Sequence, residues 1–315
     1  MSKRVVVVGS INLDLVATAE KIPVAGETVI GSNFKMFPGG KGANQAVAAA
    51  RLDADVYMIG KLGRDSFGET LRTSLLSAGV NTDSVDSIDN SSGVALIVTD
   101  ADGDNLITVV PGANGEVRPE DIAANARLIS TSGIVLSQLE IPLDAVESLA
   151  QICVEHLVPF VLDPAPARPL PQSLLEKVTY LTPNETETCS LLGWKLKELS
   201  DVDLELAASS LLGRGCKNVL LKLGARGSYL ALADGTRKRL LGYKVSPVDS
   251  TAAGDAFNAA FAVALLNRKH PISAAEWASA VAAVSVTRAG AQPSMPTSSE
   301  VESFLEERQA LAPQL

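Results

Sequence analysis

Short runs of β-branched and aliphatic residues alternate along this chain with longer segments that have helical periodicity. The runs that we interpret as buried strands lie at residues 5–8, 56–59, 134–139, 160–162 and 219–223. Strands separated by helices usually pair in parallel, because the helix carries the chain back to the edge at which the preceding strand began. The alternation therefore predicts an α/β fold in which helices flank both faces of a central, mostly parallel sheet.

Two segments break the alternation, because they contain strand-like runs with no helix between them. They cover residues 13–37 and 93–110, and the second contains Asp102-Gly103, a dipeptide typical of hairpin turns. We predict that these segments form an additional small sheet. A third hairpin is indicated at 229–241, and we expect it to flank a ligand site rather than to join the small sheet.

The length of 315 residues suits one large α/β domain with an accessory layer. The sequence has no repeat, low-complexity tract or long linker, so we expect a single domain over residues 1–315. The last third is predicted to be mostly helical. The Pro-rich segment 163–169 is short and is expected to form a rigid loop after a strand.

The net charge of -9, without a run of Lys and Arg, argues against nucleic acid or a membrane surface as partner. The apolar run at 5–8 is too short for a signal-peptide core, and no apolar run approaches the roughly 20 residues of a membrane span. The cysteines, Cys153, Cys189 and Cys216, have no C-x-x-C spacing. We therefore expect a soluble, cytoplasmic protein with free thiols.

The two histidines, His156 and His270, lie near no group of residues that suggests a triad or a metal cluster. We expect both of them on the surface. If the protein is an enzyme, its general base is then expected to be a carboxylate.

The segment Asp249-Ser250-Thr251-Ala252-Ala253-Gly254-Asp255-Ala256-Phe257 precedes a long apolar helix. A helix N-terminus offers unpaired N–H groups, and small side chains let a phosphate approach them. Asp255 in the first turn would stand beside a bound phosphoryl group, placed to take a proton from an attacking hydroxyl. Alternatively, Asp255 only complements the helix dipole and the alanines only pack. This segment alone does not decide between the two.

A second glycine-rich segment, Gly39-Gly40-Lys41-Gly42-Ala43-Asn44-Gln45-Ala46, also opens a helix of small residues. It is not a Walker A loop, because Gly42 rather than Ser or Thr follows Lys41, and it is not a G-x-G-x-x-G fingerprint. Glycines that allow close backbone approach, together with Lys41 and Asn44 as hydrogen-bonding groups, suit a polyhydroxylated small molecule.

The segment 9–14 follows the first predicted strand, where α/β sheets place ligand-binding loops. Asn12 and Asp14 are two residues apart, so on an extended chain they face the same side, where together they would hold two hydroxyls. An ordinary Asx-rich turn is the alternative, and this segment taken alone favours it.

Together these segments resemble the ribokinase-like carbohydrate kinase family, and the likeness runs from Ser10 to beyond Gly290. Residues 39–44 are similar to its N-terminal signature and residues 249–255 to its C-terminal signature. Residues 182–187 resemble the family's N-x-x-E motif, and residues 222–227 resemble its nucleotide-binding strand and loop.

The resemblance implies a three-layer fold with the small sheet as a lid, and transfer of the γ-phosphoryl group of ATP to a sugar, with the 5-hydroxyl of D-ribose as the expected acceptor. It implies that Asp255 is the catalytic base and that the amides of Ala252, Ala253 and Gly254 form an anion hole. The residues implied to hold the sugar are Asn12, Asp14, Gly40, Lys41, Asn44, Glu140 and Asp255.

The resemblance also implies the cofactor sites. The residues implied to bind ATP are Asn184, Lys222, Gly224, Arg226, Gly227, Gly254 and Ser279. Glu187 would hold Mg²⁺ through water. The residues implied to bind K⁺, mostly through backbone oxygens, are Asp249, Thr251, Ser285, Arg288, Gly290 and Ser294. The lid would close over the sugar and pair with a second lid in a homodimer.

Four positions depart from the family's pattern. Ser250 and Ala252 replace the Thr and Gly that are more usual in the C-terminal signature, and Lys222 replaces a common Thr. Ser279 stands where a side-chain partner for adenine is often found. Ala252 loses backbone freedom if its φ is positive.

Two other functions are compatible with these motifs. One is a related kinase for deoxyribose, another sugar or a nucleoside, although Asn12 would have no purpose opposite a missing 2-hydroxyl. The other is a non-catalytic sugar or nucleotide sensor with the same fold, against which the intact Asp255 segment argues. A dinucleotide-binding oxidoreductase is excluded, because no G-x-G-x-x-G follows a predicted strand.

Overall fold

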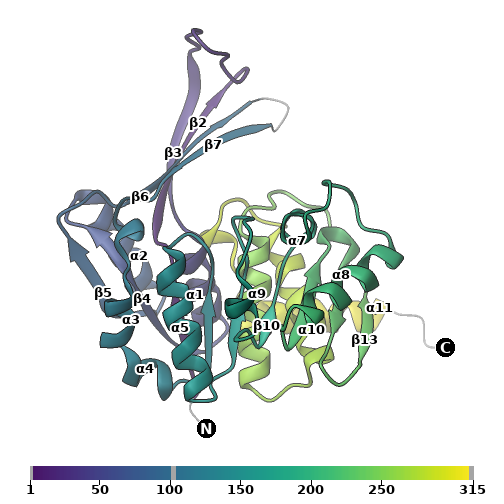
Figure 1. Cartoon of the computed structure of the whole chain (residues 1–315). Helices are drawn as coiled ribbons and strands as arrows, with labels where there is room; N and C mark the ends of the chain where they lie inside the picture. The colour runs from purple at the N-terminus through teal and green to yellow at the C-terminus, as the bar shows by residue number, and fades with distance from the viewer. Residues whose placement is uncertain (1–2, 101–103, 312–315) are drawn as a thin grey trace.

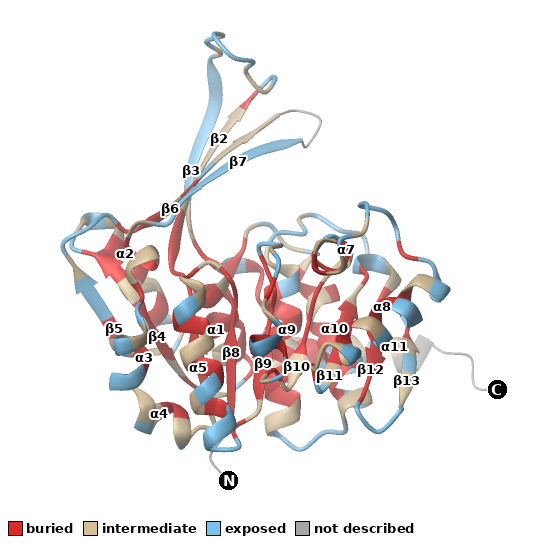
Figure 2. Ribbon diagram, viewed as in Figure 1, coloured by how far each residue is buried: buried red, intermediate tan, exposed pale blue. Residues whose placement is uncertain are grey.

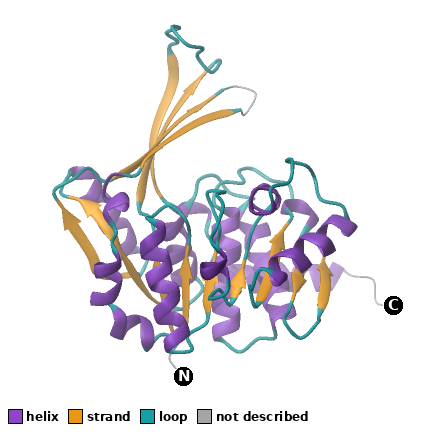
Figure 3. Ribbon diagram, viewed as in Figure 1, coloured by secondary structure: helices purple, strands orange, loops and turns teal. Residues whose placement is uncertain are grey.

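The computed structural model describes residues 3–100 and 104–311, and within them the strands form two sheets (Figure 1). The larger sheet has nine strands in this part of the chain, in the order β13-β12-β11-β10-β9-β8-β1-β4-β5. Helices cover both of its faces, which makes three layers, and the smaller sheet projects from this body (Figure 3). The predicted fold class is confirmed.

Seven neighbouring strands of the larger sheet are parallel within the described residues: β1 (Arg4–Val8), β4 (Asp55–Gly63), β5 (Asn81–Ile88), β8 (Ile134–Ser137), β9 (Phe160–Leu162), β10 (Tyr180–Leu181) and β11 (Asn218–Lys222). The hairpin of β12 (Ser228–Ala231) and β13 (Arg237–Leu240) continues the sheet antiparallel to β11. All five predicted strands are present, and the late hairpin is confirmed outside the small sheet. The strands β5 and β10 were not predicted from the sequence.

The central strands separate two hydrophobic cores, because successive side chains of a strand point to opposite faces. Val5 and Val7 of β1 belong to one core, and Val6 and Val8 belong to the other. Figure 2 shows these strands as the buried centre of the body. A strand that is buried on both faces reads as a continuous apolar run, which explains the four consecutive valines.

The helices divide between the two cores. The helices that contribute to the first core are α1 (Lys41–Arg51), α2 (Ser66–Ser77), α9 (Ala253–Leu266), α10 (Pro271–Ser285) and α11 (Ser298–Leu311). The helices that contribute to the second core are α3 (Pro119–Ala124), α4 (Ala126–Ser130), α5 (Leu143–Glu155), α6 (Gln172–Leu175), α7 (Glu185–Leu192) and α8 (Asp201–Gly213).

The small sheet consists of β3 (Gly31–Gly39), β2 (Asn12–Ala19), β6 (Gly93–Thr99) and β7 (Asn105–Val110), in that order. The pair β2 and β6 is parallel, and the other two pairs are antiparallel. The prediction that segments 13–37 and 93–110 form one sheet is confirmed. The predicted Asp102-Gly103 turn lies outside the described residues.

The remaining expectations concern single residues. Cys153, Cys189 and Cys216 are buried free thiols, and His156 and His270 are exposed, as predicted. In the described part of the chain, every helix is too short or too polar to cross a membrane.

Candidate active site

A cavity of about 860 Å³ lies at the carboxyl ends of the parallel strands, where α/β sheets bind ligands. The loops that follow β9, β10 and β11 meet there with the first turns of α1 and α9. The predicted site residues among those that line the cavity are Lys41, Asn184, Glu187, Lys222, Gly224, Gly227, Ala252, Ala253, Gly254, Asp255 and Ser279. The motifs at 39–44, 182–187, 222–227 and 249–255, which are far apart along the chain, therefore converge on one place, whereas no residue of the segment 9–14 lines the cavity.

Asp255 lies in the first turn of α9 and is only 5% exposed. One of its carboxylate oxygens accepts a hydrogen bond from Asn44 Nδ2 at 3.0 Å, and the other accepts one from Gln45 Nε2 at 3.1 Å. Burial raises the pKa of Asp255 to about 6, against the opposing effect of Lys41. The group is therefore a carboxylate at neutral pH, and it is a stronger base than an exposed aspartate.

Lys41 begins α1 and faces several acidic groups. Burial disfavours its ammonium, but the nearby carboxylates, chiefly those of Asp255 and Glu140, together outweigh this effect, so the pKa of Lys41 is raised above its usual value. Asp14 lies in the same cluster, where burial, followed by the charges of Glu140 and Asp255, raises its pKa to about 7. The site thus pairs one permanent cation with carboxylates that can change protonation near neutrality.

The first turn of α1 packs against the loop after β1 at a distance that only glycine permits. Gly40 has φ 87°, and a Cβ on it would lie 2.6 Å from the backbone nitrogen of Asn12. A Cβ on Gly39 would lie 2.3 Å from an oxygen of Asp14. Gly40 is therefore required by the close approach of the backbone at Asn12 to the start of α1, whereas a side chain on Gly39 would displace the carboxylate of Asp14.

Hydrogen bonds fix the remaining predicted sugar residues around this turn. The backbone nitrogen of Lys41 donates to Glu140 Oε2 at 3.1 Å, and the hydroxyl of Ser10 donates to the same oxygen. Asn12 Oδ1 accepts a hydrogen bond from Asn114 Nδ2 at 2.7 Å. Polar groups from β2, α1 and the loop after β8 are thereby brought together.

The N-terminus of α9 has no side chain as its cap. Its N-cap residue, Ala252, has φ 58° and therefore adopts the left-handed conformation, although this position is more usually a glycine in the family. The amide of Ala253 donates to the carbonyl of Ser250 at 3.2 Å, and Gly254 also lines the cavity. An uncapped helix N-terminus that faces a cavity is a suitable place for an anion.

Lys222 lies at the end of β11, beside the start of α9. Its Nζ forms an ion pair with Asp163 at 2.9 Å, and a Cβ on Gly254 would lie 3.6 Å from the same atom. Burial disfavours the charged lysine, but Asp163 and Glu187 raise the pKa of Lys222 above its usual value. The cavity therefore has a fixed positive charge next to the helix N-terminus.

Glu187 and Asn184 form a reciprocal cap at the start of α7. The backbone and side-chain nitrogens of Asn184 donate to the two oxygens of Glu187 at 2.7 and 2.9 Å. Burial raises the pKa of Glu187, and Lys222 opposes this shift. Among residues 3–100 and 104–311, no three His, Cys, Asp or Glu side chains are arranged to hold a metal ion by themselves.

Asp249 joins two of the segments predicted to bind K⁺. Its carboxylate accepts hydrogen bonds from the amides of Thr251 at 2.9 Å and Gly290 at 2.8 Å. The hydroxyls of Ser285 and Ser294 donate to carbonyl oxygens of their own segments, and the Arg288 side chain pairs with Glu300. The loop that precedes α9 is thereby tied to the chain after α10.

The lining of the cavity also includes the apolar residues Tyr243, Val245, Pro247 and Phe257. Ser279 also lines it, but its hydroxyl donates to the carbonyl of Ala275 on the same helix at 2.9 Å.

Arg226, which was predicted to bind ATP, is not brought into the cavity. Its guanidinium forms ion pairs with Glu185 and Glu198, and its Nη1 donates to the carbonyl of Leu199 at 2.9 Å. This side chain links the end of β11 to the segment between α7 and α8.

Two buried residues of the site were not assigned a role from the sequence. Gln45 is fully buried and bonds to Asp255, and Asp163 is 3% exposed and bonds to Lys222. Two sequence features could have identified them: Gln45 directly follows Asn44, and Asp163 directly follows a predicted strand.

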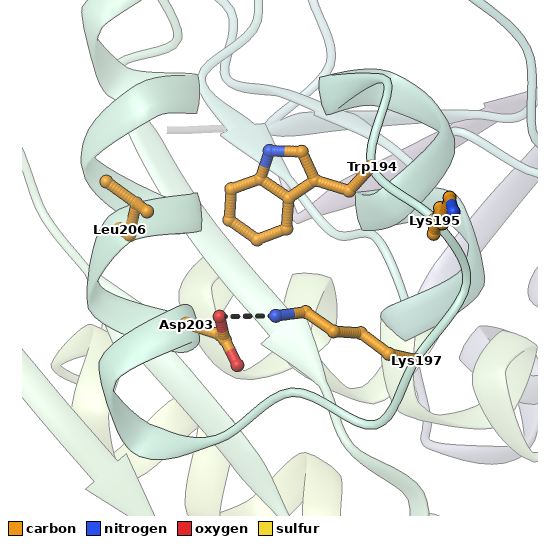
Figure 4. Close-up of a pocket in the computed structure, with 5 residues that line it drawn as sticks. All are labelled: Trp194, Lys195, Lys197, Asp203 and Leu206. Carbon is orange, nitrogen blue, oxygen red and sulfur yellow. Dashed lines mark hydrogen bonds and ion pairs between the residues drawn. The ribbon is translucent and has the colours of Figure 1, made fainter.

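A second hollow, of about 380 Å³, lies on the surface beside α8. It is lined by Trp194, Lys195, Lys197, Asp203 and Leu206 (Figure 4), none of which belongs to a motif singled out above. Lys197 and Asp203 form an ion pair across it at 2.6 Å.

Residues 2–298 match the family described as pfkB family carbohydrate kinase. The sequence is 43% identical to a ribokinase of Bacillus subtilis over 305 residues, which cover 96% of this chain and 99% of the relative.

Two solved structures share the fold over nearly the whole chain. A ribokinase from Thermotoga maritima has a TM-score of 0.88 at 37% identity, covering 96% of this chain and 99% of that one. A ribokinase from Arabidopsis thaliana, solved with ribose and ATP, has a TM-score of 0.90 at 35% identity, covering 97% and 99%.

Proposed function

Since the chain belongs to the pfkB family of carbohydrate kinases, we propose that it is a ribokinase, which transfers the γ-phosphoryl group of ATP to the 5-hydroxyl of D-ribose and releases D-ribose 5-phosphate and ADP. The observation that carries this proposal is a buried carboxylate, Asp255, in the first turn of an uncapped helix that faces a large cavity. The relatives named ribokinase, which match the chain over nearly its full length, support ribose as the acceptor.

Asp255 acts as the general base. It takes the proton of the 5-hydroxyl as the hydroxyl oxygen bonds to the γ-phosphorus of ATP, and the bond from that phosphorus to the bridging oxygen of ADP breaks. Asn44 and Gln45 hold the two carboxylate oxygens, so the base is oriented before the sugar binds. A preset orientation of this kind lowers the entropic part of the barrier.

The sugar hydroxyls bind to the polar groups around the first turn of α1. Asn12, Asp14 and Glu140 accept hydrogen bonds from hydroxyls, Asn44 contributes its amide, and Lys41 donates. The absence of a side chain at Gly40 lets the backbone at Asn12 lie against the start of α1. Tight packing of residues 9–12 against the start of α1 keeps these groups in fixed positions.

The phosphoryl groups bind between α9 and β11. Amides of the segment 252–254 and the ammonium of Lys222 stabilise the negative charge of the transferring group. The rest of ATP extends along Asn184, Gly224 and Gly227 toward the apolar part of the cavity that contains Ser279. Because the side chain of Arg226 is engaged elsewhere, we assign it no contact with ATP.

Magnesium fits this site through water. Glu187 is a buried carboxylate at the cavity wall, and an ion that keeps several waters needs only one such group together with the phosphates. When bound, Mg²⁺ would neutralise phosphate charge, and Glu187 and Asn184 would orient its water shell.

Potassium fits between the loop before α9 and the chain at the end of α10 and after it. The oxygens available there are one carboxylate, that of Asp249, and the hydroxyls and carbonyls of Thr251, Ser285, Arg288, Gly290 and Ser294, which are the hard ligands that a monovalent cation prefers. A bound K⁺ would support the conformation of the segment 249–252 and take no part in the chemistry.

The small sheet serves as the lid and as a dimer contact. One side of the sheet bears Phe34, Met36, Leu96 and Leu106, which we call the apolar lid face. These residues share a side because they stand in the same rows across the strands as Leu15, Ala17 and Val98. All four are exposed. Asp14 lies on the opposite side, which covers the sugar. A second copy of the lid would bury the apolar lid face in a homodimer. We place this soluble enzyme in the cytoplasm.

The proposal is tested by ADP release with MgATP and K⁺ against D-ribose, 2-deoxy-D-ribose, D-fructose, adenosine and pseudouridine. We expect the highest kcat/KM for D-ribose. A preference for another acceptor would keep the mechanism and reassign Asn12, Asp14 and Glu140 as determinants of a different specificity. No acceptor-dependent ADP release with any of them would favour the sensor.

A further inference from the structure

The side-chain amide of Gln45 joins two carboxylates. Its Nε2 donates to Asp255 Oδ1 at 3.1 Å and to Asp163 Oδ2 at 3.2 Å, so both hydrogens of one amide are used. Its Oε1 accepts a hydrogen bond from Gln138 Nε2 at 2.7 Å, which fixes the orientation of the amide. The two aspartates are therefore held at a set separation by one buried group.

Asp163 has a second partner on its other oxygen. Its Oδ1 pairs with Lys222 Nζ at 2.9 Å, and both side chains are largely buried, at 4% and 11% exposure. The same Nζ lies beside Gly254 at the start of α9. A continuous chain of contacts thus runs from the proposed phosphate site through Lys222, Asp163 and Gln45 to Asp255.

Several charged groups act on Asp255 from the elements around it. They are Lys41 at the start of α1, Asp14 on β2, Asp163 after β9 and Lys222 on β11. The other long neighbour of α9 is α10, and its one charged residue, Glu276, is exposed. Of these groups, Asp163 and Lys222 are the two that form an ion pair with each other.

We propose that Asp163 is a positioning residue that links the phosphate site to the base: it shares the Gln45 amide with Asp255 and holds Lys222 beside the start of α9. The inference rests on the proposed function, since it assumes that a phosphoryl donor binds there. In this proposal Asp163 acts through Gln45 and Lys222.

The link makes the base respond to the donor. While Lys222 pairs with Asp163, the charge of Asp163 is largely neutralised. Donor phosphates compete for the ammonium of Lys222. The ammonium then neutralises less of the negative charge of Asp163, so this charge acts more strongly on Asp255. A nearby negative charge disfavours ionisation, so Asp255 binds a proton more strongly once the donor is present. The base is strengthened when there is a phosphoryl group to transfer.

The test is the pH dependence of kcat/KM for D-ribose at saturating MgATP, between pH 5 and pH 8. The acid limb is the part of this profile in which kcat/KM falls as the pH decreases. Asp163→Asn keeps the size of the side chain and removes its charge, so the acid limb should move to lower pH. Lys222→Met keeps the aliphatic stem and leaves Asp163 uncompensated, so the limb should move to higher pH. Each shift should be about one pH unit, as for unit charges partly screened inside a protein.

Two further variants separate charge from structure. The double variant Asp163→Asn with Lys222→Met removes both charges, so its limb should return toward that of the wild type. Lys222→Arg keeps the positive charge, so its limb should stay close to that of the wild type. A residue that only maintained the fold would lower activity without moving the limb in opposite directions.

The surface pair of Lys197 and Asp203 provides the matched control (Figure 4). Lys197→Met removes one lysine from a Lys–Asp pair, as Lys222→Met does, but at the hollow beside α8. Its acid limb should coincide with that of the wild type.

The outcomes distinguish the inference from the function on which it rests. Opposite shifts with a restored double variant support the link. If the acid limb moves in neither single variant, or moves in the same direction in both, the inference is wrong and the proposed kinase function is unaffected. Absence of ribose-dependent ADP release by the wild type overturns the proposed function as well. If Asp163→Asn does not fold, Lys222→Met and Lys222→Arg still decide, because an unmoved limb in Lys222→Met contradicts the link.

Discussion

Opposing forces act on the Asp255 carboxylate. Burial disfavours its charge, whereas Lys41 and the amides of Asn44 and Gln45 favour it, and burial prevails, so that the pKa is about 6. A base with a much lower pKa would accept a proton poorly, and one with a pKa far above 7 would already carry it at neutral pH. The surroundings of Asp255 therefore suit proton abstraction at physiological pH.

Asp255→Asn should abolish the base and preserve the hydrogen-bonding shape of the side chain. We expect kcat to fall by about 10²–10⁴-fold, the range for loss of a general base, with little change in the KM for the sugar. Steady-state kinetics with varied D-ribose measures both quantities. A variant that turns over at a rate near that of the wild type would show that another group takes the proton.

The pH profile follows from the same pKa. The carboxylate form is the active one, so kcat/KM for D-ribose should fall as the pH drops through about 6, by about tenfold per unit at lower pH. Asp14, with a pKa of about 7, titrates nearby, and Asp14→Asn is the control. In that variant the limb should persist near pH 6, because Asp14, with the higher pKa, is already mostly protonated where Asp255 titrates. Loss of the limb would assign it to Asp14.

The sequence identified site residues that belong to compact motifs and missed those defined by distant contacts. Asp255 and Lys41 each stand in a recognisable local segment, and the structure brings both into one cavity. The link of Gln45 to Asp163 joins residues 118 positions apart, which no local pattern reveals. Arg226 lies in a motif, but the acidic residues that draw its side chain away are in another segment.

At the level of elements, strands with a continuous apolar run were predictable, and strands without one were not. β5 is an edge strand with the sequence NTDSVDSI, in which polar residues outnumber apolar ones. β10 has only two residues and owes its position to pairing with β9 and β11. Tertiary context, rather than propensity, determines both of them.

The contact between α1 and the loop after β1 should depend on Gly42. A Cβ there would lie 2.7 Å from the carbonyl carbon of Gly9 and from the nitrogen of Ser10, so Gly42→Ala must displace the helix. We expect a loss of about 1–3 kcal/mol in the free energy of unfolding, as for overpacking. Denaturant unfolding of the purified variant measures it.

Gly213→Ala is the matched control, because Gly213 also lies in a helix but has no atom within 4 Å of an added Cβ. This change should stabilise the protein by up to about 1 kcal/mol, since alanine restricts the unfolded chain. Equal effects of the two substitutions would contradict the proposed tight contact at Gly42.

At the scale of the whole molecule, the lid has little core of its own. A four-stranded sheet that projects from the body leaves both faces to be covered by something else. One side bears Asp14, and the apolar lid face on the other bears Phe34, Met36, Leu96 and Leu106, which are 46–60% exposed. Contiguous apolar side chains on a strand surface favour association, so a second lid is the natural partner of this face.

Leu106→Glu should therefore convert a dimer into monomers, because the dimer would bury a charge without a partner. Sedimentation velocity at micromolar protein measures the state directly, and the wild type should sediment as a dimer. Leu206→Glu is the control, because Leu206 on α8 is exposed to nearly the same extent, 55% against 53%, but lies far along the chain from the lid. A dimer that persists in Leu106→Glu, or dissociates equally in Leu206→Glu, would place the contact elsewhere. A monomeric wild type would mean that the lid closes over the sugar without a second copy.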